Sequence, residues 1–303
     1  MDRKKGCVVG VIGLGAMGFG MASSLRKADF DVVGFDPAET ARSRAKDAGV
    51  SVLDTPESVF EAADVIVLSL PTARHVERVV NDAMAAGYLS KGLPSKVVID
   101  TSTSEALISR KLAAMLEAEG HGFLDAPVSG GPSGAAAGKL SVMLGGAENR
   151  VKEAMPVLEA MAANILHVGQ SGAGNVAKLV NNMLVANHMI TTREALRLAE
   201  TSGVSAETAL KVINSATGRS AISEIHFPTW VIPRSFDSGF STGLMRKDLR
   251  LARELAAESG TATPMADLAA ELWDESLSGL KDEDDFMLMG DPNLEFAPSE
   301  EKK

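Results

Sequence analysis

Three glycines near the N-terminus follow the spacing G-x-G-x-x-G: Gly13, Gly15 and Gly18 come directly after the apolar run Cys7–Ile12. Between a strand and a helix this spacing is typical of dinucleotide binding. The first glycine permits a tight turn, the second lets the backbone approach a pyrophosphate, and the third lets the helix pack on the strand. A turn without a ligand is the alternative, and the placement favours the dinucleotide site.

The second β-branched run ends at Asp36, where such a site has an acid facing the adenosine ribose. A carboxylate accepts a hydrogen bond from a free 2′-hydroxyl and repels a 2′-phosphate, so the sequence favours NAD over NADP. Arg42 and Arg44 follow on the next helix and offer a possible phosphate contact. We interpret both as a solvated helix face.

The first half of the chain alternates β-branched runs with amphipathic helical stretches, a pattern typical of crossover helices covering a parallel sheet. Strands are expected over Cys7–Ile12, Val32–Asp36, Val65–Leu70, Val97–Asp100 and Leu140–Leu144. Helices are expected over Met17–Ala28, Pro37–Ala48, Ala73–Asn81 and Glu105–Glu119. The predicted fold class is α/β, beginning with an N-terminal Rossmann-type doubly wound sheet.

From Gly174 onward Ala, Leu, Met and Glu dominate, and β-branched runs disappear. This composition predicts an all-α helical domain that opens on a long interdomain helix. Helices are expected over Asn175–Ser202, Ala206–Ala216, Leu244–Glu258 and Pro264–Ser278. We place the dinucleotide-binding domain at residues 1–172 and the helical domain at 173–303, with a frayed acidic tail from about Lys281.

Composition excludes several other classes of protein. The net charge is −10 and no basic stripe interrupts it, so we expect no nucleic-acid partner. No apolar run approaches the roughly 18 residues of a membrane span, and no secretion signal is recognised. The one cysteine, Cys7, fits a reducing cytoplasm. The histidines show no metal-ligand spacing, so no metal is expected.

Two further segments carry groups suited to chemistry. Asp125–Gly131 ends in Ser129, Gly130 and Gly131, whose hydroxyl and backbone N–H groups are able to hold a carboxylate. Lys178 and Asn182 lie four residues apart on the long helix, hence on one face. A lysine with a lowered pKa can act as general acid or base. A plain loop and a solvated helical lysine are the alternatives.

The chain resembles the β-hydroxyacid dehydrogenases, the family of 3-hydroxyisobutyrate, L-threonate and 2-(hydroxymethyl)glutarate dehydrogenases and tartronate semialdehyde reductase. The resemblance covers nearly the whole length and rests on motifs in the same order. They are Val11–Gly18, Leu70-Pro71, Asp125–Gly131, Gly172–Asn182 and Lys247–Ala252. It implies hydride transfer between the hydroxyl-bearing carbon of a small 3-hydroxy carboxylate and nicotinamide, in a homodimer or homotetramer whose helical domain serves substrate binding and dimerisation.

The resemblance also implies roles for individual residues. Lys178 would be the catalytic acid/base, Asn182 would orient the substrate, and Ser129, Gly130 and Gly131 would hold the carboxylate. Lys247 would approach the cofactor from the helical domain. The implied cofactor set is Gly13, Leu14, Gly15, Ala16, Met17, Gly18, Asp36, Leu70, Pro71, Thr103 and Lys247.

Two places depart from the family pattern. Ser24 stands where relatives often have Asn, and Asp285–Met289 lacks the Ser-Ala-Val run of many members. We interpret the first as harmless, and the second leaves the choice of substrate open. Alternative functions are reduction of a small aldehyde acid such as tartronate semialdehyde, imine reduction, or a non-enzymatic NAD-binding interaction role. Retention of Lys178 argues against the last two.

Overall fold

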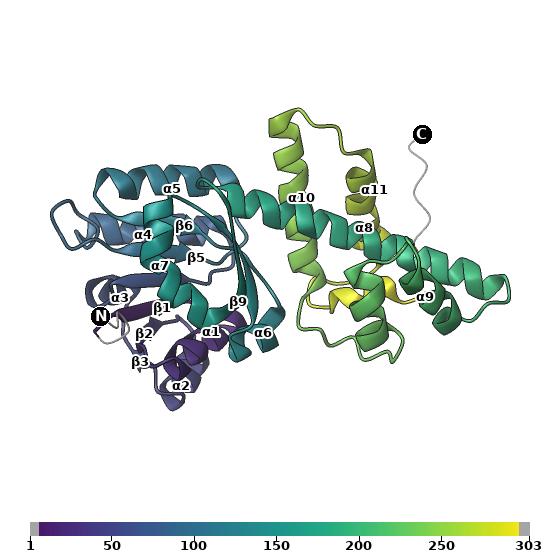
Figure 1. The fold of residues 1–303 in the computed structure, drawn as a ribbon, viewed down its shortest axis with the longest axis horizontal. Helices are drawn as coiled ribbons and strands as arrows, with labels where there is room; N and C mark the ends of the chain where they lie inside the picture. Colours follow the sequence, from purple (N-terminus) through teal and green to yellow (C-terminus); the bar gives the residue numbers. More distant parts are fainter. Residues whose placement is uncertain (1–5, 297–303) are drawn as a thin grey trace. The chain divides into compact units, whose positions relative to one another are not determined.

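The computed structural model describes residues 6–296, and they divide into two compact units with the boundary between Lys178 and Leu179. The sequence placed the change of domain slightly earlier, at residues 172/173. Figure 1 traces the chain through both units. Among the described helices, none combines the length and the apolar character that a membrane crossing requires.

The first unit is built on one sheet, which the described residues form in the order β3-β2-β1-β4-β5-β6-β8-β7, with β9 paired to β8. Strands β1 to β6 run parallel, and β8 is antiparallel to β6 and β7. The bounds are β1 Val8–Ile12, β2 Asp31–Phe35, β3 Ser51–Val52, β4 Val65–Leu68, β5 Val97–Asp100, β6 Gly122–Asp125, β7 Val128–Ser129, β8 Leu140–Gly145 and β9 Ala162–Gly169. Strand order reverses between β1 and β4, the point at which open α/β sheets bind ligands.

The side chains of the parallel strands pack into two separate cores, because successive residues of a strand face opposite sides of the sheet. Val65 and Val67 of β4 pack with α1, α2 and α7, whereas Ile66 and Leu68 pack with α3, α4 and α5. Both faces are therefore covered (Figure 1). The helices are α1 Ala16–Lys27, α2 Glu39–Asp47, α3 Pro56–Ala62, α4 Ala73–Ala85, α5 Ala106–Ala118, α6 Gly131–Ala137 and α7 Glu148–Met161.

The second unit is helical around an aromatic core. Trp273 is fully buried, donates its indole N–H to the Ala186 carbonyl at 3.3 Å, and stacks with Phe286 at 6.4 Å between ring centroids. The elements are α8 Ala173–Thr201, which begins in the first unit, α9 Ala206–Ser215, the π-helix η1 Ile222–Val231, α10 Thr242–Ser259, α11 Pro264–Trp273, α12 Glu275–Ser278 and the 3-10 helix η2 Phe286–Gly290.

The fold class predicted from the sequence is confirmed, including the long helix α8. Several elements are not predicted from the sequence: the strands β3, β6, β7 and β9, and the helices α3, α6, α7 and η1. The strand β6, Gly-Phe-Leu-Asp, contains no β-branched residue, and β9 leaves Leu166 and Val168 exposed, so neither carries a clear strand pattern. Helix α7 contains Pro156, a residue that normally marks a helix end.

The expectation of a frayed tail from Lys281 is wrong for η2. Phe286, Met287 and Met289 are buried in the core of the second unit. Asp285 anchors the segment by accepting hydrogen bonds from the Ser238 hydroxyl at 2.8 Å and the Gly239 N–H at 3.0 Å. The apolar stretch of η2 is short, is flanked by acidic residues and shows no helical period, so the sequence pattern does not reveal it. The part of the predicted tail beyond Phe296 lies outside the described residues.

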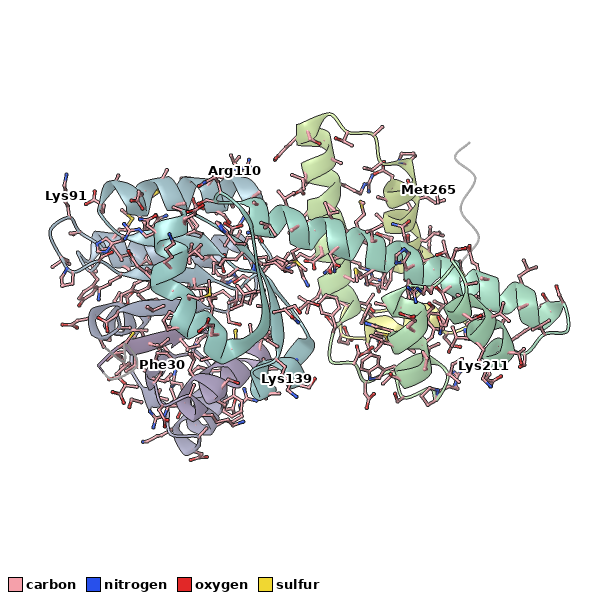
Figure 2. All side chains as sticks on the ribbon, in the orientation of Figure 1. Phe30, Lys91, Arg110, Lys139, Lys211 and Met265 are labelled. Atoms are coloured by element: carbon pink, nitrogen blue, oxygen red, sulfur yellow. The ribbon has the colours of Figure 1, made fainter. Side chains whose placement is uncertain are left out.

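A matched pair of methionines tests this assignment. Met287 is fully buried, whereas Met265 on α11 is 61% exposed and lies at the surface (Figure 2). We expect Met287→Ala to lower the free energy of unfolding by about 2–5 kcal/mol, because it leaves a cavity. Met265→Ala should change it by no more than about 0.5 kcal/mol. Urea denaturation measures both, and equal effects would show that η2 does not belong to the core.

Candidate active site

The glycine turn lies at the carboxyl end of β1, beside the strand reversal. Gly13 and Gly18 are buried against each other: a Cβ on Gly18 would lie 1.8 Å from the Gly13 carbonyl oxygen. Gly15, by contrast, is exposed, and a Cβ there would meet no atom within 4 Å. Leu14 is buried under the turn, while Ala16 and Met17 begin α1. The turn therefore presents an open backbone surface at Gly15 that fits the approach of a pyrophosphate.

Asp36 holds this turn from the end of β2. Its Oδ2 accepts the Leu14 N–H at 2.7 Å and its Oδ1 accepts the Ala38 N–H at 2.8 Å. Each carboxylate oxygen keeps a further lone pair, so Asp36 can also accept a ribose hydroxyl. The residues present thus fit the adenosine end of a dinucleotide.

Arg42 is half-buried and Arg44 is exposed on α2, and both also hydrogen-bond to the protein. The Arg42 guanidinium donates to the Asp36 carbonyl at 2.8 Å and pairs with Glu39. Arg44 donates to the Leu14 carbonyl at 2.8 Å and lies 4.3 Å from the centre of the Phe19 ring. Arg44 therefore braces the glycine turn, and Arg42 braces the segment after β2 that carries Asp36.

The turns after β4 and β5 are joined to each other. Leu70, whose side chain would lie 3.2 Å from a Cβ on Gly13, donates its N–H to the Ser102 hydroxyl at 3.0 Å. Pro71 is exposed and Thr103 is half-buried. Leu70 and Thr103 therefore belong to two connected turns at the edge that carries the glycine turn.

Lys178 lies in the second turn of α8 and is only 6% exposed. The start of this helix is held by Asp125, at the end of β6, which accepts the Gly172 N–H at 2.7 Å and the Asn175 N–H at 3.1 Å. The first N–H groups of a helix have no partner within the helix, and a carboxylate satisfies them. The lysine is therefore not a solvated surface residue.

A buried acid pair lies beneath these turns. Asp100 and Asp125 are direct neighbours on β5 and β6. Burial raises the pKa of Asp100 to about 7, and the charge of Asp125 adds to the rise, against hydrogen bonds from Ser102 and Ser104. Burial also raises the pKa of Asp125, while the N–H groups of Gly172 and Asn175 oppose the rise.

The glycine-rich segment forms a strand and a helix instead of a plain loop. Ser129 ends β7 opposite Ser141 of β8, and Gly130 and Gly131 lead into α6 with φ angles of +123° and +62°. Ser24, which we interpreted as harmless, donates its hydroxyl to the Ala135 carbonyl at 2.7 Å. Ser24 thus holds α6, and the departure from the family pattern has a structural role here.

Asn182 is fixed from α10 within the second unit. Its Nδ2 donates to Asp248 Oδ2 at 2.6 Å, and the Lys247 ammonium lies 3.5 Å from Asp248 Oδ1. Asp248 is 2% exposed, so this acid sets the orientation of the Asn182 amide and lies beside Lys247. Asp248 lies in the motif Lys247–Ala252, but the sequence alone assigns it no role. The signal that the sequence offers for Asp248 is its place directly after Lys247, a predicted site residue.

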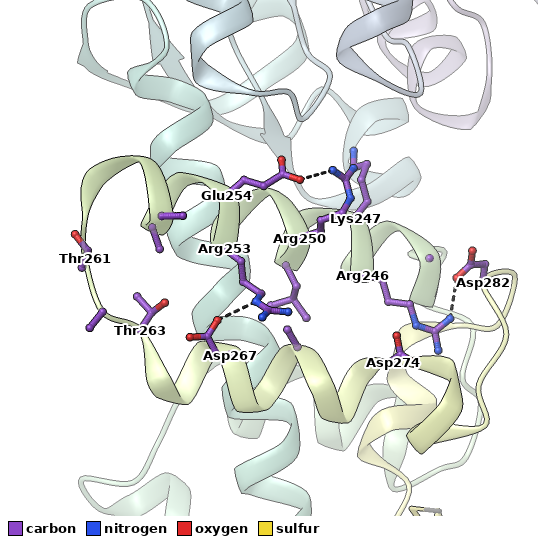
Figure 3. Close-up of a pocket in the computed structure, with 16 residues that line it drawn as sticks. Arg246, Lys247, Arg250, Arg253, Glu254, Thr261, Thr263, Asp267, Asp274 and Asp282 are labelled. Carbon is purple, nitrogen blue, oxygen red and sulfur yellow. Dashed lines mark hydrogen bonds and ion pairs between the residues drawn. The ribbon is translucent and has the colours of Figure 1, made fainter. Parts of the chain in front are cut away.

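A cavity of about 810 Å³ lies between α10 and α11 (Figure 3). Of the predicted site residues, Lys247 lines it. Its arginines are paired with acids: Arg250 with Glu254 at 2.8 Å, Arg253 with Asp267 at 2.8 Å, and Arg246 with Asp282 at 2.7 Å. The cavity therefore has no excess of positive charge that would select an anion.

Two further observations concern an exposed arginine and metal binding. Arg219 lies 3.8 Å from Glu224 in an exposed ion pair. Within residues 6–296, no group of three His, Cys, Asp or Glu side chains is arranged to hold a metal ion.

Comparisons with known proteins match two family models to this chain. Residues 8–169 match the family model described as the NAD-binding domain of 6-phosphogluconate dehydrogenase. Residues 172–291 match the model described as NAD-binding of NADP-dependent 3-hydroxyisobutyrate dehydrogenase. The two models together cover nearly all of the described chain.

Individual relatives match over most of their length. A probable 3-hydroxyisobutyrate dehydrogenase of Mycobacterium tuberculosis is 42% identical over 88% of this chain and 90% of its own. An NAD-dependent L-serine dehydrogenase of Pseudomonas aeruginosa is 38% identical with the same coverage. A solved structure of M. tuberculosis 3-hydroxyisobutyrate dehydrogenase with L-serine superposes with a TM-score of 0.86 and 38% identity, covering 93% of this chain and 98% of that one.

The turn, the strand reversal and these matches define a dinucleotide-dependent oxidoreductase. The chain belongs to the β-hydroxyacid dehydrogenase family. It is an NAD-dependent dehydrogenase that acts on a hydroxyl group.

Substitutions in the glycine turn separate cofactor binding from folding. Because a Cβ on Gly15 meets no protein atom, Gly15→Ala should leave the melting temperature within about 2 °C of the wild type. It should weaken NADH binding at least about tenfold, since the methyl group occupies the approach to the pyrophosphate. Fluorescence titration with NADH measures the Kd. Gly18→Ala is the control for packing, and it should lower the melting temperature because a Cβ there clashes with the Gly13 carbonyl. An unchanged Kd in Gly15→Ala would contradict the placement of the cofactor.

The raised pKa of Asp100 gives a second prediction. Between about pH 4 and pH 7 the native protein holds a proton on Asp100 that the unfolded chain has released, because the native pKa is about 7. The free energy of unfolding should therefore fall with rising pH in this window, by up to about 1.4 kcal/mol per pH unit from this group, and level off above it.

The stability of Asp100→Asn relative to the wild type should accordingly rise from pH 5 to pH 8, as measured by urea denaturation. The exposed Asp47 supplies the control substitution Asp47→Asn, whose curve should run parallel to that of the wild type. Parallel curves for Asp100→Asn as well would contradict the raised pKa.

Proposed function

We propose that this enzyme oxidises a small 3-hydroxy carboxylate with NAD, using Lys178 as the acid/base. The observation that carries the proposal is the burial of Lys178 near the start of α8, because Asp125 holds that start at the sheet edge where the glycine turn also lies. A lysine largely closed off from water is suited to act as a general acid or base.

The proposed roles follow from the side chains. During oxidation Lys178 accepts the proton of the substrate hydroxyl, and Asn182 donates an amide hydrogen bond to the same oxygen. The hydrogen bond from Asn182 to Asp248 keeps the amide turned for that task. In the reverse direction the Lys178 ammonium returns the proton to the forming alkoxide.

NAD, when bound, supplies the two-electron acceptor for the carbon that carries the hydroxyl. The residues that would hold it are the turn Gly13–Gly18 and Asp36 at the adenosine end, Leu70, Pro71 and Thr103 at the nicotinamide end, and Lys247. The hydrogen bonds of Arg42 to the Asp36 carbonyl and of Arg44 to the Leu14 carbonyl support a preference for NAD over NADP, because both guanidinium groups are already engaged.

Ser129, Gly130 and Gly131 are proposed to bind the substrate carboxylate. Gly130 and Gly131 have positive φ angles, a backbone that can turn successive N–H groups toward one point. The Ser129 hydroxyl adds a donor beside them. Fixing the carboxylate sets the distance to the hydroxyl two carbons away, and thus selects 3-hydroxy acids.

The names of the relatives support this substrate class. Both 3-hydroxyisobutyrate and L-serine are a primary alcohol attached to the carbon next to a carboxylate, and they differ in carrying a methyl or an amino group there. Threonate-like and hydroxymethyl-dicarboxylate substrates stay open. Reduction of a small aldehyde acid such as tartronate semialdehyde is the same step in reverse. The dehydrogenase relatives leave a non-enzymatic role without support.

We place the enzyme in the cytoplasm as a homodimer or homotetramer. The single cysteine, Cys7, is half-buried directly before β1. Burial and the charge of Asp64 raise the pKa of its thiol, which disfavours the thiolate form that a reactive thiol needs. The oligomer is proposed from the resemblance to the family.

The experiment follows NADH absorbance when the purified protein meets NAD and a panel of 3-hydroxyisobutyrate, L-serine, L-threonate and 2-(hydroxymethyl)glutarate. We expect turnover with at least one acid and a loss of about 10²- to 10⁴-fold in Lys178→Ala. The exposed Lys211, labelled in Figure 2, provides the control Lys211→Ala, which should keep the wild-type rate.

Two results would overturn the proposal. One is the absence of turnover with every acid of the panel in protein that binds NADH. The other is full activity of Lys178→Ala, which would remove the lysine from the chemistry while leaving the reaction class intact.

A further inference from the structure

The first turn of α8 is tied to the sheet by a side chain that the proposed chemistry does not use. Asn175 is fully buried. Its Oδ1 accepts the Ser104 N–H at 3.0 Å, and its Nδ2 donates to the Ser109 hydroxyl at 3.0 Å. An amide supplies one acceptor and two donors from the same group, so Asn175 meets both partners at once.

This anchor continues into the turns that carry the predicted nicotinamide contacts. The Ser104 hydroxyl donates to Asp100 Oδ2 at 3.3 Å, and Asp100 Oδ1 accepts the Ser102 N–H at 2.9 Å. The Ser102 hydroxyl in turn accepts the Leu70 N–H at 3.0 Å. Buried hydrogen bonds therefore link the turn after β4, the turn after β5 and the start of α8.

The helix start has little room to move. Gly174 lies so close to the sheet that a Cβ there would be 2.3 Å from the Met143 carbonyl oxygen and 2.6 Å from that of Asp125. Asn175 precedes Lys178 by three residues, so the two are neighbours on the helix surface. Any shift or rotation of the helix start would carry Lys178 with it.

We propose that Asn175 is a positioning residue: its hydrogen bond to the Ser104 N–H fixes α8 in register with the cofactor turns and so places the Lys178 amine. The inference rests on the proposed role of Lys178. Asp125 satisfies backbone N–H groups of the helix start, and Asn175 adds the side-chain anchor that connects this start to the turn containing Thr103. A shift of about 1 Å in a catalytic group can cost about 100-fold in rate.

The test compares Asn175→Ala with Ser109→Ala, which removes a partner of the amide and leaves the Ser104 bond. We expect kcat to fall about 10- to 100-fold in Asn175→Ala and to stay within about threefold in Ser109→Ala. The Kd for NADH should stay within about twofold in both, because Asn175 bonds to Ser104, Ser109 and Asp125 and not to the glycine turn or Asp36, where the adenosine end would bind. Asn175→Ser, which leaves a smaller gap, replaces Asn175→Ala should that variant not fold.

A double substitution separates positioning from general destabilisation. If Asn175 acts through the lysine, adding Asn175→Ala to Lys178→Ala should change the residual rate by less than about threefold, whereas a merely structural role lowers it again. An unchanged kcat in Asn175→Ala, or an NADH Kd weakened as much as kcat, overturns the inference.

A second readout does not depend on turnover, and it distinguishes failure of this inference from failure of the proposed function. The buried Lys178 amine should react with a small amine-reactive ester at least about tenfold faster in Asn175→Ala than in the wild type, measured by peptide mass spectrometry. Labelling of Lys211 should be equal in both. Equal labelling of Lys178 overturns the inference even in a protein that oxidises none of the acids.

Discussion

The carboxylate of Asp125 accepts hydrogen bonds from the Gly172 and Asn175 N–H groups, and this contact joins the two kinds of architecture in the chain. On one side is the edge of a mostly parallel sheet, and on the other is the first turn of a 29-residue helix that continues into the helical unit. The first N–H groups of a helix have no hydrogen-bond partner within the helix, and here the buried carboxylate at the end of β6 accepts them. Because Lys178 lies in the second turn of this helix, the contact also fixes where Lys178 lies.

Burying two acids side by side has a cost that the surrounding groups only partly offset. Asp100 and Asp125 are register partners on β5 and β6, and burial raises the pKa of both. The groups that compensate are the same ones that organise the site: serine hydroxyls, backbone N–H groups of the turns, and the start of α8. The polar network thus belongs both to the buried core and to the proposed site, which makes single substitutions in it informative.

The second unit repeats this arrangement on a smaller scale. Asp248, buried on α10, fixes the Asn182 amide and lies beside the Lys247 ammonium. Arg234 and Asp291 bind each other through two hydrogen bonds of 3.0 and 2.9 Å, which fasten the segment after η2. Apolar packing supplies the core, and paired charges fix which segments lie over it.

The sequence alone determined the α/β class, the glycine turn, Asp36 and the long helix, because these depend on local spacing and periodicity that neighbouring residues carry. It also singled out Lys178 and Asn182, although only the resemblance to a family raised them above a solvated helix face. Tertiary structure decided what depends on contacts between distant residues: the burial of Lys178, the hydrogen bond from Arg44 to the glycine turn, the Asn175 anchor, and the packing of Phe286 and Met287 into the core. A periodic pattern records which face of an element is apolar, and it does not record which buried partner, 50 or more residues away, will satisfy a polar group on that face.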